Sequence, residues 1–502
     1  MRADARLRTR TSALPVKRFK TLMQPQTVQL IRGLGLVAAI SVNVSNVIGT
    51  GVFLKARVMT CNIVTPGKAL MVWVFAGLLS LAGALTYAEL LAMMPRAAGE
   101  YGIIRDAYGR AGGFLYGWTQ FVIARTASAA ALAVGFAIFL NDLLGGALKP
   151  VYYQYVIGGH TISFGRLQVV ALAAILVTTV INSAAVRVSG GVATALTVIK
   201  VLVLVGVGTV AFVYSGGDWG HLSQANTGGT CEAVAVTGGG FAGLAAAMLG
   251  ALWAYDGWNN VTFMAGEIKR PERNIPLALI GSMLLVMAVY VFVNVSYYHV
   301  LSPTEVASVP AASSTAAEVV RRILGSTAVT LMAAAMMTSS FGALQSSMLA
   351  TARVPYALAQ DRLVFQGLGK LSTRTHVPVR PLIVQGIWAG VLVLAGSYDI
   401  LTDVAVFALT MFYALVAGSV FIFRRRMPDA PRPYRTIGYP VVPILFLIVT
   451  TWLILTTIWN TPLQSSIGVA LILLGLPVYL YWERHNRRTG GTPKYTEREQ
   501  EQ

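Results

Sequence analysis

Two apolar stretches of the chain are interrupted by residues that could bind a small polar molecule. The first contains Gly49-Thr50-Gly51 inside an otherwise apolar run. Glycine inside a helix costs about 1 kcal/mol relative to alanine, so two glycines flanking a hydroxyl residue predict that the helix unwinds there. Unwound backbone at membrane depth is tolerated only where protein or a polar ligand satisfies its N–H and C=O groups. The alternative is that these glycines only permit close helix packing.

The second stretch starts at Leu252-Trp253 and is broken by Asp256, by a glycine and by two asparagines. A carboxylate inside a membrane is costly and marks a functional site by default. A pair of interrupted helices at matching positions in two halves of a chain is typical of secondary transporters. Half-helix N-termini would hold a carboxylate and free carbonyls would hold an ammonium, which fits the zwitterion of an α-amino acid.

Three charged residues inside apolar stretches have more than one interpretation. Asp256 could pair with a cationic substrate side chain, or it could cap a half-helix. Arg125 could face a central cavity, or it could pair near the cytoplasmic interface. Lys200 could reach the membrane surface only if it lies near the end of its helix.

The composition predicts that these residues lie in a polytopic membrane protein. Of 502 residues, 55% are hydrophobic and only 12% are charged, whereas a soluble domain carries roughly 25% charged residues. About twelve stretches reach the length of roughly 20 apolar residues that a membrane-spanning helix needs. They lie near 31–54, 67–94, 114–144, 166–185, 191–214, 240–265, 275–300, 326–352, 380–397, 401–423, 438–459 and 463–482.

The distribution of positive charge predicts the orientation. Lys and Arg gather in the N-terminal tail, in every second loop and in the C-terminal tail, so both termini are expected to be cytoplasmic. This pattern also accounts for the net charge of +19 without nucleic-acid binding. Cys61 and Cys231 then fall on the opposite side, where either a disulfide or two unpaired thiols is compatible with the sequence.

Several ordered motifs resemble the amino acid–polyamine–organocation superfamily, most closely its L-type amino-acid transporter branch. They are Val-Ile-Gly-Thr-Gly-Val-Phe at 47–53, Tyr-Ala-Glu-Leu at 87–90, Pro-Arg-Ala-Ala-Gly-Glu-Tyr at 95–101, the segment 253–259, Gly-Glu-Ile-Lys-Arg-Pro at 266–271, and Phe-Gly-Ala-Leu at 341–344 with Ala-Gln-Asp-Arg at 359–362. Motifs in order over about 300 residues are more specific than a lone glycine pattern. The resemblance suggests a bacterial member.

The resemblance implies an all-α membrane protein with the LeuT-type fold, a five-plus-five inverted repeat of about 12 transmembrane helices in which helices 1 and 6 are broken. The corresponding divisions are a cytoplasmic tail at 1–30, a first repeat at 31–216, a second repeat at 240–424, two further helices at 436–482 and a second cytoplasmic tail at 483–502. We expect a multi-pass protein of the plasma or inner membrane.

The resemblance also implies roles for individual residues. The substrate-binding residues would be Val47, Gly49, Thr50, Gly51, Trp253, Ala254, Asp256 and Asn259, with Trp253 as an aromatic gate. The charge of Lys200 would occupy the place where sodium-coupled relatives bind sodium, between helices 1 and 8. Gln345 stands where the family usually has asparagine, and it is a further candidate for substrate contact.

These features predict a secondary active transporter: a sodium-independent exchanger of neutral or cationic L-amino acids. The alternatives are a proton-coupled permease for cationic amino acids or polyamines, and a nutrient sensor with a transporter fold. We expect no enzyme activity, cofactor or metal, because no cluster of His, Asp, Glu and Cys supports such chemistry. No cysteine occurs at 145–165, so no disulfide-linked heavy chain is expected. The oligomeric state is open.

Overall fold

A computed structural model provides the coordinates of the chain. It describes residues 30–489 apart from positions 31, 64, 96–98, 158–159, 185, 215, 233, 235, 237–239, 311–312, 396–397 and 461. Nearly all of the expected N-terminal tail, and the expected C-terminal tail from residue 490 onward, therefore lie outside the described residues.

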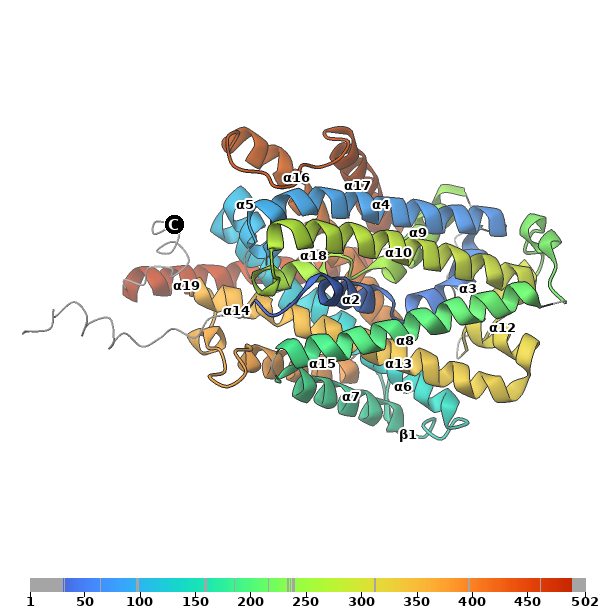
Figure 1. Cartoon of the computed structure of the whole chain (residues 1–502). Helices are drawn as coiled ribbons and strands as arrows, with labels where there is room; N and C mark the ends of the chain where they lie inside the picture. Colours follow the sequence, from blue (N-terminus) through green and yellow to red (C-terminus); the bar gives the residue numbers. More distant parts are fainter. Residues whose placement is uncertain are drawn as a thin grey trace, which may run out of the picture.

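The regular elements in the first half of the described chain are helices and one β-hairpin (Figure 1). Its elements are α2 (Leu36–Val47), α3 (Gly51–Ile63), α4 (Pro66–Met93), α5 (Gly99–Trp118), the π-helix η1 (Thr119–Ala124), α6 (Arg125–Leu143), β1 (Val151–Ile157), β2 (His160–Gly165), α7 (Arg166–Asn182), α8 (Val186–Val213) and η2 (Trp219–Ser223). The antiparallel hairpin β1–β2 lies next to α7. Its tyrosines, valines and isoleucines favour extended backbone.

The regular elements in the described part of the second half are all helices. Its elements are α9 (Gly240–Tyr255), the 3₁₀-helix η3 (Asn260–Glu267), α10 (Pro271–Val300), α11 (Pro303–Ala307), α12 (Thr315–Leu324), α13 (Ser326–Thr351), α14 (Arg353–Gln360), η4 (Gln366–Gly369), α15 (Val379–Ala395), α16 (Tyr398–Arg426), α17 (Val441–Asn460), α18 (Pro462–Leu473) and α19 (Gly475–Thr489). The short helices α11 and α12 connect α10 to α13.

The helices confirm a multi-pass membrane protein. Among the described residues, eight helical segments are long and apolar enough to cross a membrane, and α2 with α3 adds a ninth if the bent pair forms one span. The segments 166–182 and 379–394 are apolar but shorter. A helix overlaps each of the stretches expected from the sequence. The count of about twelve spans stays a prediction.

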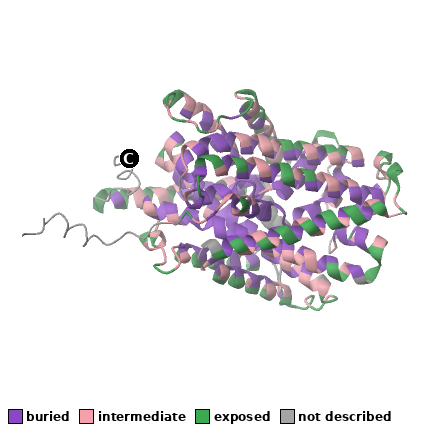
Figure 2. Cartoon of the chain, in the orientation of Figure 1, coloured by how far each residue is buried: buried purple, intermediate pink, exposed green. Residues whose placement is uncertain are grey.

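Long helices packed against one another form the core. Helix α10 packs against α4, α2 and α8, while α13 packs against α6, α8 and α2. Counting along the chain, α4 and α10 correspond to the second and seventh expected spans, and α6 and α13 to the third and eighth. Pairs at matching positions are what two five-helix halves would produce. Figure 2 shows that buried residues concentrate where these helices meet around α2.

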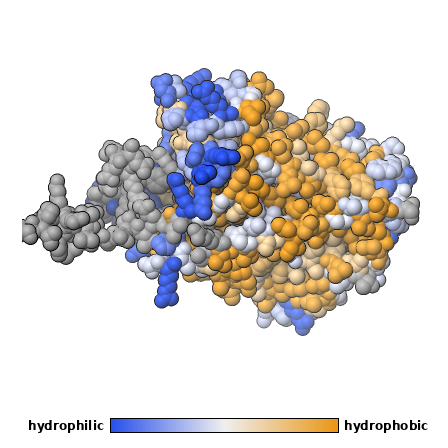
Figure 3. Space-filling model, in the orientation of Figure 1, coloured by the Kyte–Doolittle hydropathy of each residue, from blue (hydrophilic) through white to orange (hydrophobic). Residues whose placement is uncertain are grey.

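The surface has an apolar band between two more polar ends. Figure 3 shows hydrophobic residues over most of the visible helical face and hydrophilic residues gathered at the end near α19. Large apolar side chains point outward from α4, α8 and α17, namely Met71, Phe75, Leu78, Val198, Ile199, Leu202, Ile444, Leu445 and Ile448. An exposed apolar surface of this kind suits lipid rather than water.

Candidate substrate site between two broken helices

The first break separates α2 from α3 inside one predicted span. Helix α2 ends at Val47 and α3 begins at Gly51, and their axes differ by 41°. A Cβ atom on Gly51 would lie 2.5 Å from the Cα atom of Ala254, which is in the other broken helix. Only glycine therefore allows the two breaks to touch at this point, which gives a physical reason for the residue.

The second break follows α9 and is tied directly to the first. Helix α9 ends at Tyr255, and Gly257 adopts a positive φ of 94° against the backbone of Asn46. The amide of Asn260 donates a hydrogen bond of 2.9 Å to the side-chain oxygen of Asn46. Buried amide side chains thus fix the position of one break against the other.

Lys200 supplies donors to the broken first span. Its buried Nζ atom donates to the carbonyl oxygens of Ser45, Ile48 and Ser339 at 3.0, 2.7 and 3.0 Å. The ammonium, which comes from α8, therefore lies between α2 and α13. It satisfies carbonyls that the end of α2 leaves without helical partners.

Tyr290 links the two breaks and was not anticipated from the sequence. Its hydroxyl group, on α10, lies 3.0 Å from the carbonyl oxygen of Val47 and 2.9 Å from that of Ala254. A single phenolic proton is thus shared between carbonyls at the ends of α2 and α9. Tyrosines recur in apolar helices of this chain, so nothing in the sequence distinguished this one.

A cavity opens between the two breaks. It is lined by Asn46, Val47, Gly49, Thr50, Gly51, Arg125, Ser128, Leu132, Trp253, Asp256, Gly257, Asn260 and Ser347. Six of these residues were expected from the sequence, while Ala254 and Asn259 lie behind the lining. The hydroxyl of Ser128 has no hydrogen-bond partner among the described residues, so it is available to a ligand in the cavity.

The cavity has donors and acceptors that suit an amino acid. The N-terminus of α3 begins at Gly51, and the first N–H groups of a helix lack intrahelical partners and attract anions. Carbonyl groups near the end of α9 can accept hydrogen bonds from an ammonium. Trp253 is 8% exposed and forms part of the apolar wall with Leu132.

Arg125 and Asp256 form an ion pair in the cavity wall. Nη1 of Arg125 donates to Oδ2 of Asp256 at 2.8 Å, and the hydroxyl of Tyr413 donates to Oδ1 at 2.6 Å. Nη2 of Arg125 donates to Asn259 at 2.9 Å and to Tyr413 at 2.7 Å. Arg125 thus faces the cavity, as one of its two interpretations held, and the Asp256 carboxylate already has a cationic partner.

Glu100 lies beyond this pair and is fully buried. It accepts hydrogen bonds from Asn259, Thr262 and Tyr116 at 2.7, 2.8 and 2.9 Å. Asn259 therefore joins Arg125 to Glu100, which explains why its side chain is not part of the cavity lining.

Gln345 is bonded on the other side of its helix. Its side-chain amide donates to the side-chain oxygen of Asn182 at 2.8 Å, and its backbone carbonyl accepts from the Asn182 amide at the same distance. Gln345 is not among the residues that line the cavity. These bonds connect α13 to α7.

A second cavity shares one lining residue with the first. Its lining is mostly apolar: Leu79, Ser80, Leu252, Asp256, Trp258, Val406, Leu409, Thr410, Tyr413, Phe446, Thr450 and Leu453. Asp256 is the one residue that lines both cavities. The Asp256–Tyr413 hydrogen bond therefore stands between them.

Buried ion pairs join the helices at the basic end. Glu89 accepts from Arg424 at 2.9 and 2.7 Å, and Asp361 pairs with Arg105 at 3.0 Å. Arg353 and Glu267 form a fully buried pair at 2.7 Å. These contacts hold α16 to α4, the 3₁₀ segment η3 to α14, and α5 to the turn after α14.

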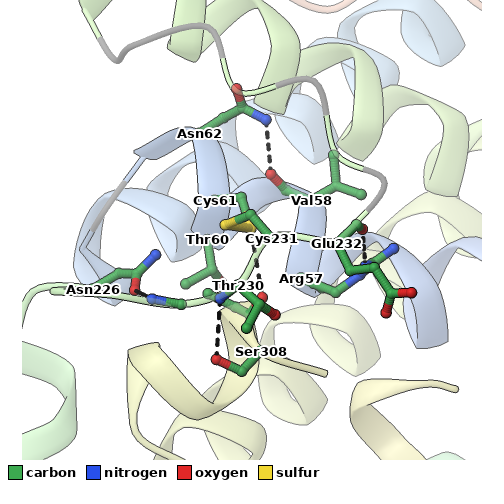
Figure 4. The surroundings of a disulfide bond; sticks show 12 residues. Arg57, Val58, Thr60, Cys61, Asn62, Asn226, Thr230, Cys231, Glu232 and Ser308 are labelled. Carbon is green, nitrogen blue, oxygen red and sulfur yellow. Dashed lines mark hydrogen bonds between the residues drawn. A yellow bond between two sulfur atoms is a disulfide. The ribbon is translucent and has the colours of Figure 1, made fainter. Parts of the chain in front are cut away.

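A disulfide bond joins Cys61 and Cys231 at the opposite end (Figure 4). It ties the end of α3 to the segment before α9, and Cys231 N–H donates to the carbonyl of Ala307 on α11 at 3.1 Å. The structure thus resolves the two interpretations of the cysteines in favour of the disulfide.

Near the disulfide, burial raises the pKa of the Glu305 carboxyl. Hydrogen bonds from Arg322 and Ser302 outweigh the effect of burial and hold that pKa below its usual value.

The part of the chain that the structure describes contains no group of three His, Cys, Asp or Glu residues arranged to hold a metal ion.

Comparison with known proteins identifies the family. The family model described as amino acid permease matches residues 34–481. The chain is 29% identical to the serine/threonine exchanger of Bacillus subtilis (strain 168), over 90% of this chain and 96% of the exchanger. It is 29% identical to the human b(0,+)-type amino acid transporter 1, over 91% and 89% of the two chains. It is 28% identical to the human large neutral amino acids transporter small subunit 2, over 91% and 82%.

A family match across most of the chain agrees with the broken helices and with the motifs that pointed to the amino acid–polyamine–organocation superfamily. The chain belongs to the amino acid permease family.

Proposed function

We propose that the protein exchanges amino acids across a cell membrane by alternating access, without sodium. The observation that carries the proposal is the polar cavity between the two broken helices in a chain of the amino acid permease family. The substrate carboxylate binds at the N-terminal N–H groups of α3, and the substrate ammonium binds carbonyls near the break in α9. Exchange is the activity named for the relative from Bacillus subtilis.

Independence from sodium is supported by Lys200. Its ammonium is surrounded by three carbonyl oxygens at 2.7–3.0 Å between α2 and α13. Carbonyl oxygens are also the ligands that a sodium ion would need at this position. The positive charge of the Lys200 ammonium repels a second cation, and this disfavours sodium binding at the same position.

The proposed orientation places the basic end of the molecule in the cytoplasm. The disulfide then lies on the outside, where oxidising conditions preserve it. The chain contains two cysteines, and both are in this disulfide. No thiol is left for a covalent link to a second chain, which supports a transporter without a disulfide-linked heavy chain.

A counterflow assay tests the proposal. The purified protein is reconstituted into liposomes that are either empty or loaded with unlabelled alanine, and uptake of radiolabelled alanine, serine and leucine is measured in sodium or choline buffer. We expect uptake to require internal amino acid and to be equal in the two buffers. Equal uptake into empty liposomes, or uptake that follows a sodium gradient, would contradict the proposal. Uptake into empty liposomes driven by a proton gradient would favour the proton-coupled permease instead.

A further inference from the structure

Arg125 and Asp256 are the only charged residues among those that line the cavity between the broken helices. Their charges cancel at a separation of 2.8 Å. We propose that this pair determines specificity by excluding amino acids with a cationic side chain and restricting transport to amino acids with an uncharged side chain. The inference rests on the proposed exchange of amino acids and names the substrate class for the same cavity.

The Asp256 carboxylate already has a partner on each oxygen. Oδ2 accepts from the Arg125 guanidinium at 2.8 Å, and Oδ1 accepts from the Tyr413 hydroxyl at 2.6 Å. A cationic substrate side chain that approached this carboxylate would also approach the guanidinium. Like charges at such a distance in a buried site repel strongly, so the Asp256 carboxylate does not bind the cationic side chain of a substrate.

Arg125 cannot easily move aside to expose Asp256. Its Nε donates to Gln120 at 3.2 Å, and its Nη2 donates to Asn259 at 2.9 Å and to Tyr413 at 2.7 Å. Four of its five N–H groups thus have partners, and three of these four bonds do not involve Asp256. The side chain is 1% exposed, compared with 12% for Asp256.

The neighbouring charged residues do not change the net charge of the cavity lining. Glu100 lies behind Asn259, with three donors of its own. Lys200 is bonded to three carbonyls between α2 and α13. Neither residue lines the cavity, so a ligand meets one positive and one negative group that already neutralise each other.

Charge-altering variants test the proposal through a gain of function. Liposomes loaded with alanine are assayed for initial uptake of alanine, arginine and glutamate. The parent protein should carry alanine and carry arginine poorly. In Arg125→Gln the carboxylate loses its cationic partner, and the arginine-to-alanine ratio should rise by about tenfold or more, the ratio that one charge-assisted hydrogen bond supplies.

Three further variants serve as controls. Arg125→Lys keeps the positive charge and should not gain arginine uptake. Asp256→Asn leaves the guanidinium without its carboxylate and should raise the glutamate-to-alanine ratio instead. The double variant Arg125→Gln with Asp256→Asn has no charge in the cavity wall, and neither ratio should rise. Should a variant exchange too slowly for the assay, stabilisation of the purified variant against heat by arginine or glutamate gives the same comparison.

The outcomes separate this inference from the proposed function. Arginine uptake by the parent at the rate of alanine overturns the inference while leaving amino-acid exchange intact. Absence of any gain in arginine uptake or arginine stabilisation in Arg125→Gln also overturns it. Absence of exchange of every amino acid by the parent contradicts the proposed function itself.

Discussion

At the scale of residues, buried polar side chains hold the ends of the broken helices. Lys200 and Tyr290 donate to carbonyls at the ends of α2 and α9. A charge in an apolar stretch is visible in the sequence, so Lys200, Arg125 and Asp256 could be singled out in advance. Their partners could not, because the ion pair joins residues 131 positions apart. Tyr290 carried no signal, since a phenol is ordinary in an apolar helix.

The Tyr290 hydroxyl should be needed for exchange. In Tyr290→Phe both carbonyls lose this donor, and loss of a buried hydrogen bond costs about 1–3 kcal/mol. We expect a lower melting temperature and slower alanine exchange. Tyr297→Phe is the matched control, because Tyr297 is buried in the same helix and its hydroxyl has no partner among the described residues. Equal melting temperatures and exchange rates of the two variants would show that neither stability nor exchange depends on the hydrogen bonds of the Tyr290 hydroxyl.

At the scale of elements, the positions of both breaks could be predicted because glycine and polar residues interrupt apolar runs. Helix α2 ends two residues before Gly49, and α9 ends one residue before Asp256. Other elements could not be predicted, because the sequence contains no pattern that marks them. The π-helical segment at Thr119–Ala124 lies inside the expected third span, and a π-turn has no characteristic periodicity in the sequence. The helices α11 and α12 lie between two of the expected spans, where no helix was expected.

The contact between the two breaks should tolerate no side chain at Gly51. A methyl group there would meet the backbone of Ala254 at 2.5 Å, so Gly51→Ala must push α3 away from α9. We expect alanine exchange to be lost or severely reduced. Gly281→Ala, also in an apolar helix, is the control, since a Cβ atom there meets nothing within 4 Å. Normal exchange in Gly51→Ala would contradict the close approach of the two breaks.

The disulfide should stabilise the C-terminal end of α3. It closes a loop of 170 residues, and loss of a native disulfide typically costs about 2–5 kcal/mol. Reducing agent should therefore lower the melting temperature of the purified protein. Cys61→Ser should do the same and should remove the effect of reducing agent. Because the two sulfurs act as one unit, the double variant with Cys231→Ser should melt no lower than the single variant. A parent protein that is insensitive to full reduction would show that the bond contributes nothing.

At the scale of the whole molecule, the low charge content predicted a membrane protein, and the apolar band in Figure 3 agrees with that. The order in which helices pack was beyond the sequence alone, because α10 contacts α4, α2 and α8 through similar apolar surfaces. The two cavities were equally hidden, because each collects residues from several helices. The account therefore depends on whether the amino acid binds in the cavity between the breaks.

Cysteine protection tests this central claim most directly. The parent chain has no free thiol, because its two cysteines form the disulfide. Ser128→Cys therefore places a single reactive thiol in the cavity lining. We expect a small thiol-reactive methanethiosulfonate to block exchange in this variant and not in the parent, and saturating alanine to slow the block. A thiol that reacts equally fast with and without an exchanged amino acid would mean that the substrate binds elsewhere.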